Sequence, residues 1–217
     1  ALPLRGRQIM LLAASYLFYC WDTPVYGILI FASTLLDYLV GLGLARTENP
    51  RGRKALLGCS LLGNLGMLGF FKYGDFLGAN LVGLGHLLGF AGHWEPMGFI
   101  LPVGISFYTF QTLSYSIDVY KRQLPAERNL WTFALYVCYF PQLVAGPIER
   151  APHLLPQLCE QHPVLLENLV AGAKRILTGL FLKLVVADRL GILVDSVFAA
   201  PGNHSALATW MALVAFA

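Results

Sequence analysis

Residues 25–45 read VYGILIFASTLLDYLVGLGLA, and Asp37 is the only charged side chain among them. About 20 apolar residues, each adding 1.5 Å of helix, are enough to cross a hydrocarbon core roughly 30 Å thick. A run of this length and composition predicts a transmembrane helix.

Comparable apolar runs occur along the whole chain, and we predict further spans at residues 8–21, 55–71, 99–117, 130–148 and 164–187. The run 206–217 has the composition of the start of another span. Short stretches with Pro, Gly or charges separate the runs, and none has room for a second, soluble domain. The expected fold is an all-α, polytopic transmembrane region over residues 1–217. Because the chain starts with Ala1 and its last run is short, we expect a fragment of a longer domain.

The composition supports a membrane protein and excludes other classes. Of the 217 residues, 57% are hydrophobic and 12% are charged, whereas about a quarter of a soluble domain is charged. The net charge of +3 is small and scattered, which excludes a nucleic-acid partner. The four cysteines form no CxxC pair, so the sequence predicts neither a disulfide framework nor a metal site.

Two short basic loops, residues 46–54 and 121–128, are predicted to be cytoplasmic because Lys and Arg favour that side. If residues 55–71, 76–92 and 99–117 all crossed the membrane, these loops would lie on opposite sides. The run 76–92 contains five glycines, each costing about 1 kcal/mol in a helix interior relative to Ala. We therefore expect residues 76–92 to be in-plane or re-entrant on the outer side.

Polar side chains within the spans are the first candidates for function, because they are costly in a bilayer. The second half of the run 99–117 is polar without a charge, and its candidates are Ser106, Tyr108 and Gln111. Hydrogen bonding between packed helices is the more common role of such residues, and lining a polar cavity is the alternative. Pro102 and Gly104 predict an opened first turn in this helix.

Residues 139–150, YFPQLVAGPIER, do not read as a lipid-facing helix. Proline removes a backbone donor and breaks the helix, and broken backbone at membrane depth must be buried or line a cavity. An ordinary kink explains the pattern equally well. The candidates for the wall or mouth of a substrate tunnel are Pro141, Gln142, Gly146, Pro147 and Arg150.

Lys183 and Asp188 flank an apolar stretch near the end of the run 164–187. They could line a cytoplasmic entrance for a charged acyl donor. Snorkelling at a helix end and a local charge pair are the favoured interpretations.

Four blocks carry a resemblance to a known family. Residues 101–111, LPVGISFYTFQ, with 114–120 after them, look like the signature of the membrane-bound O-acyltransferase (MBOAT) family. Residues 70–73, 139–148 and 179–188 are similar to its alginate O-acetyltransferase branch. The blocks occur in order over nearly the whole chain.

The resemblance implies a multi-pass enzyme of the bacterial inner membrane that acetylates an exported polysaccharide, with alginate as the first expectation. It implies acetyl-CoA or another activated acetyl group as donor and no bound cofactor. The expected partners are the lipid bilayer and periplasmic acetyltransferases, which would carry the group to the polysaccharide acceptor. The alternatives are a D-alanyl transferase of teichoic acids in the same family and, from a different class, a secondary transporter or channel.

The resemblance implies chemistry that depends on an intramembrane histidine, which follows a tryptophan and acts as general base or closely supports acyl transfer. None of the five histidines here (His86, His93, His153, His162 and His204) follows a Trp. We therefore expect no catalytic residue in this chain and place the family's histidine downstream of it.

Overall fold

The computed structural model describes residues 3–21, 23–90, 92–96, 98, 101–143, 146–147, 149–160, 163 and 165–216. These residues form helices and connecting segments without any strand, which confirms the all-α fold class. The chain divides into two compact units, residues 1–161 and 162–217. The predicted span ends Phe99, Ile148, Val164 and Ala217, and also His162, lie outside the described residues.

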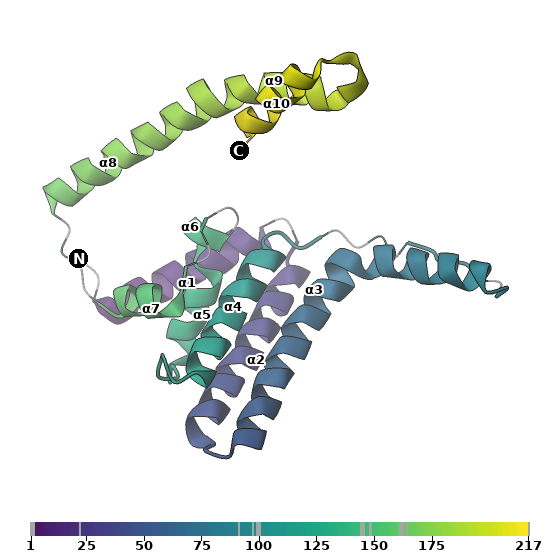
Figure 1. Cartoon of the computed structure of the whole chain (residues 1–217). Helices are drawn as coiled ribbons and strands as arrows, with labels where there is room; N and C mark the ends of the chain where they lie inside the picture. The colour runs from purple at the N-terminus through teal and green to yellow at the C-terminus, as the bar shows by residue number, and fades with distance from the viewer. Residues whose placement is uncertain are drawn as a thin grey trace. The chain divides into compact units, whose positions relative to one another are not determined.

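The first unit is built on three long helices that lie side by side: α2 (Val25–Arg46), α3 (Pro50–Leu87) and α4 (Ile105–Tyr120) (Figure 1). Both α1 (Leu4–Cys20) and α2 pack against α5 (Leu130–Cys138). Among the described residues, α2 and α3 are the two helices that have the length and apolar composition to cross a membrane. The opening run 25–45 thus coincides with α2 to within one residue.

Local sequence signals explain where helices begin. The Asn49 side chain accepts a hydrogen bond from the Arg51 backbone N–H, and Pro50 occupies the first turn of α3. Asn129 caps α5 in the same way through the Trp131 N–H. These caps satisfy backbone donors that have no partner within the helix.

Arg53 holds one end of the three-helix bundle together. Its buried guanidinium donates to the carbonyl oxygens of Leu44 in the last turn of α2, of Thr47 just after it, and of Val119 and Tyr120 at the end of α4. A cation at helix C-termini is favourable because the last carbonyls have no intrahelical donor. The loops that follow α2 and α4, predicted to be cytoplasmic, therefore lie at the same end of the bundle.

The predicted runs 55–71 and 76–92 belong largely to one continuous helix, since α3 extends to Leu87. Figure 1 shows the first part of α3 beside α2 and its second part bending away from the bundle. The in-plane or re-entrant position of residues 76–92 stays a prediction.

The predicted run 130–148 is divided. Helix α5 ends at Cys138, and a single turn, α6 (Phe140–Leu143), follows. The nine residues of α5 span only about 14 Å at 1.5 Å per residue. The chain continues to α7 (Ala151–Cys159), which packs against α5.

The second unit contains α8 (Leu166–Phe181), which continues through a π-helical segment (Leu182–Ala187) into α9 (Asp188–Ala199). A 3₁₀ turn (Pro201–Asn203) leads to α10 (Ala206–Phe216), which packs against α9. The rings of Phe198 and Phe216 meet edge to face, with their centroids 6.4 Å apart. No side chain of α8 is buried.

Candidate functional site in the first unit

The blocks at residues 101–111 and 139–148 meet in space. Gly104, just before α4, has a φ of +73°, and a Cβ atom there would lie 2.5 Å from the carbonyl oxygen of Leu143 in α6. Only glycine combines this left-handed backbone with so close an approach. The start of α4 therefore rests directly on the end of the broken helix.

Gln111 and Tyr136 join α4 to α5 further along. Gln111 Nε2 donates to the Tyr136 carbonyl oxygen at 2.7 Å, and the Tyr136 hydroxyl donates to the Gln111 carbonyl oxygen at 3.3 Å. Both side chains are buried. Gln111 thus has the packing role that the sequence favoured for this polar helix.

The broken helix closes into a tight turn. Gln142 is buried, whereas Pro141 and Pro147 are exposed. The Gly146 N–H donates to the Gln142 carbonyl oxygen at 2.9 Å, and a Cβ on Gly146 would lie 2.7 Å from Gln142 Cα. A side chain at position 146 would therefore open the turn.

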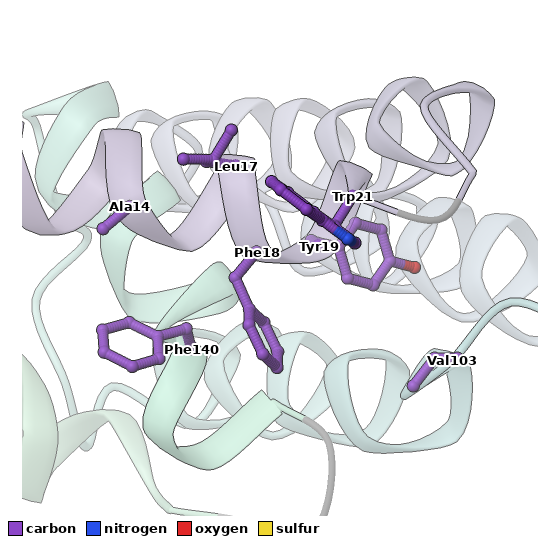
Figure 2. Close-up of a pocket in the computed structure, with 7 residues that line it drawn as sticks. All are labelled: Ala14, Leu17, Phe18, Tyr19, Trp21, Val103 and Phe140. Atoms are coloured by element: carbon purple, nitrogen blue, oxygen red, sulfur yellow. The ribbon is translucent and has the colours of Figure 1, made fainter.

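An apolar pocket lies where α1, the segment before α4 and α6 come together (Figure 2). Its volume is about 710 Å³, and its lining residues are Ala14, Leu17, Phe18, Tyr19, Trp21, Val103 and Phe140. None of the predicted site residues lines it. Val103 and Phe140 belong to the blocks 101–111 and 139–148, however, so each block contributes one residue to a pocket whose other lining residues lie between Ala14 and Trp21.

Two tyrosines give this pocket a polar feature. Tyr19 lines the pocket, and its ring meets that of Tyr108 edge to face at 6.4 Å. Within the described residues, neither hydroxyl has a hydrogen-bond partner, although both are buried. Leaving a buried hydroxyl unpaired costs about 1–3 kcal/mol, so each of these groups keeps an unused hydrogen-bond donor. Tyr108, a predicted candidate, thus contacts a residue that lines the pocket.

Ser106 is half-buried near the start of α4, and its hydroxyl accepts a hydrogen bond of 3.5 Å from Lys72 Nζ. Lys72 also lies over the Tyr73 ring, 5.4 Å from its centroid. This contact brings the block 70–73 to the block 101–111.

The structure does not bring Arg150 to the pocket. Arg150 pairs with Asp118 Oδ1 at 2.6 Å, near the end of α4 opposite to Gly104. The Asp118 side chain is buried and that of Arg150 is largely exposed. Arg150 is not among the residues that line the pocket, and its place at the mouth of a substrate tunnel stays a prediction.

A buried polar network between α2, α3 and α4 was missed. The carboxylate of Asp37 accepts hydrogen bonds from Ser60, from Asn64 Nδ2 at 2.6 Å and from Ser116 at 2.7 Å. Ser33 donates to Asn64 Oδ1 at 2.8 Å. Asp37 is the only charged residue in the run 25–45, but its hydrogen-bond partners come from other helices. Ser60 and Asn64 are four residues apart and therefore share one face of α3, and this spacing is the sequence signal that could have indicated the network.

Comparisons with known proteins agree with the family resemblance of the four sequence blocks. The chain is 36% identical to the probable alginate O-acetylase of Pseudomonas putida over 98% of its length, and 35% identical to that of Pseudomonas aeruginosa. It is 29% identical to the peptidoglycan O-acetyltransferase of Helicobacter pylori over 96% of its length. The chain is a homologue of the alginate O-acetylases. The resemblance to the alginate branch of the MBOAT family is thereby confirmed.

The chain spans only part of these relatives, 43% of the P. putida protein and 40% of the P. aeruginosa protein. No family model and no solved structure matches it.

Residues 179–188, the last of the four blocks of the family resemblance, belong to the second unit. Lys183 and Asp188 form an ion pair there, and both side chains are exposed. Residues five apart point in different directions on an α-helix. The backbone hydrogen bonds of a π-helical segment run between residues five apart, and this wider turn brings Lys183 and Asp188 together. The structure therefore shows the local charge pair that the sequence favoured.

Proposed function

We propose that the whole protein is a multi-pass enzyme of the bacterial inner membrane that acetylates an exported polysaccharide, with alginate as the first candidate. The names of its Pseudomonas relatives support this activity. The donor would be acetyl-CoA or another activated acetyl group, and periplasmic acetyltransferases would pass the group to the polysaccharide.

The observation behind the proposal is the pocket between α1, the segment before α4 and α6. Its walls are apolar, Tyr19 lines it, and Tyr108 meets the Tyr19 ring; among the described residues, the buried hydroxyls of both tyrosines have no partner. Apolar walls suit an acyl or lipid portion of a ligand, and a phenol hydroxyl can donate to a carbonyl oxygen. We propose that Tyr19 and Tyr108 bind the carbonyl oxygen of the acyl group.

The test uses full-length protein in its host and measures the acetyl content of the exported polysaccharide. Tyr19→Phe and Tyr108→Phe remove one hydroxyl each and are expected to lower acetylation several-fold at unchanged protein level. Tyr16→Phe is the matched control, because its hydroxyl is also buried without a partner among the described residues, but Tyr16 neither lines the pocket nor shares the ring contact of Tyr19 and Tyr108. Equal acetylation in all three variants would contradict the role of the pocket.

Peptidoglycan is the second candidate acceptor, because the H. pylori relative is named a peptidoglycan O-acetyltransferase. Measuring ester-linked acetate separately on exported polysaccharide and on isolated cell wall, with and without the gene, distinguishes the two acceptors. Loss of acetate from the cell wall alone would overturn the alginate assignment.

A further inference from the structure

The second half of α3 and the segment that returns along it form a distinct element, which we call the α3 arm (residues 75–96, described at 75–90 and 92–96). Trp94 Nε1 donates to Asp75 Oδ1 at 3.3 Å, and a Cβ on Gly78 would lie 2.2 Å from the Trp94 ring. His86 Nε2 lies 2.7 Å from the Gly92 carbonyl oxygen. The returning segment therefore covers one face of the helix.

The opposite face of the helix is uncovered and apolar. Leu77, Leu81, Leu84 and Leu88 follow the 4-3-4 spacing of one helical stripe, and each side chain is more than half exposed. Phe76 and Leu87 widen the stripe and are also exposed. On the covered face, Gly78 is buried and Val82 and Gly85 are half-buried. The arm is thus amphipathic because of its tertiary contacts.

The distribution of charge identifies what the stripe can bind. No charged residue occurs between Asp75 and Glu95. Asp75 and Glu95 lie at the base of the arm, where Trp94 contacts the helix. A contiguous leucine stripe with no charge beside it has no feature that would select a charged protein partner, but it suits hydrocarbon.

We infer that the α3 arm lies in the plane of the membrane interface, with the leucine stripe in contact with lipid acyl chains. The arm continues α3, a helix with the length and composition of a membrane span, and bends away from the bundle (Figure 1). Its opposite face carries the polar contacts of His86 and Trp94, and an indole suits the boundary between water and hydrocarbon. This inference does not depend on the proposed acetyl transfer.

The test places a spin label at Leu84→Cys in full-length protein whose native cysteines are replaced, in vesicles of phosphatidylcholine and phosphatidylglycerol. His86→Cys is the matched control, because it lies on the same helix and is exposed on the other face. We expect the label at position 84 to be several-fold more accessible to oxygen than to a water-soluble nickel complex, and the label at position 86 to show the reverse. Equal oxygen accessibility at both positions would indicate a true span, and nickel accessibility at position 84 would indicate exposure to water. Either result would overturn the inference.

A second measurement keeps the native cysteines. A photo-crosslinking amino acid at position 84 of the full-length protein should form adducts with lipid, detected by mass spectrometry. Adducts with a second copy or with another segment of the chain would show that protein covers the stripe, and would also overturn the inference.

Discussion

The carboxylate of Asp37 on α2 accepts a hydrogen bond from the hydroxyl of Ser116 on α4, 79 residues later in the chain. Ser60 and Asn64 on α3 donate to the same carboxylate. One acidic side chain thus connects three helices. An unpaired polar group buried between them is costly, so the network fixes which faces of the helices meet.

Asp37→Ala should destabilise the first unit by at least about 2 kcal/mol, because it leaves several buried donors without an acceptor. The expected result is a lower unfolding temperature of the purified protein in detergent. Asp37→Asn retains an acceptor oxygen and should lose less. Leu39→Ala is the control on the same helix, because its side chain is more than half exposed. Equal unfolding temperatures for Asp37→Ala and Leu39→Ala would show that the network contributes nothing.

Gly104→Ala should destabilise the contact between α4 and α6. Its φ of +73° is costly for alanine, and the new Cβ would meet the Leu143 carbonyl oxygen at 2.5 Å. Gly98→Ala separates these two effects, because Gly98 has a φ of +64° but open space around it. We expect a loss of about 1 kcal/mol from backbone strain at Gly98 and a clearly larger loss at Gly104, measured by thermal unfolding. Equal losses would mean that the contact with Leu143 is unimportant.

A reporter fused after Arg122 should behave as cytoplasmic. Arg53 bonds to carbonyls at the ends of both α2 and α4, so the two basic loops share one end of the bundle, and their Lys and Arg favour the cytoplasm. Only an odd number of crossings between Phe71 and Asp118 agrees with this position. Periplasmic alkaline phosphatase activity at the Arg122 junction would contradict it and would make residues 76–92 a true span.

The 217-residue chain alone should not transfer acetyl groups. General base catalysis needs a titratable side chain held against the reacting group, and His86, His93, His153 and His204 are all exposed. A radiolabelled acetyl-transfer assay in proteoliposomes would compare the chain with the full-length protein and its partners. Turnover by the chain alone would mean that the catalytic residue is already present in it and that the assignment to a downstream histidine is wrong.

Local sequence patterns predicted the helical fold and part of the candidate site. Apolar run length predicted α2, and the prolines and glycines of residues 139–150 predicted the break after α5, because both depend on residues close in sequence. The pocket itself was not predicted. Tyr19 lies in an ordinary apolar run, and its proximity to Tyr108 depends on how α1 packs against α2, α5 and α6.

The sequence by itself therefore determined that this is an all-α membrane protein of a recognisable family, and it marked the segments where the helices break. The tertiary structure decided which of those segments meet. It brought Gly104 against the Leu143 carbonyl oxygen, brought hydrogen-bond donors to the Asp37 carboxylate, and packed Trp94 against one face of the α3 arm. Hydropathy and proline content are properties of a single segment, whereas these contacts join residues from different segments. They depend on which helix faces pack together, and a single helical segment does not specify its neighbour.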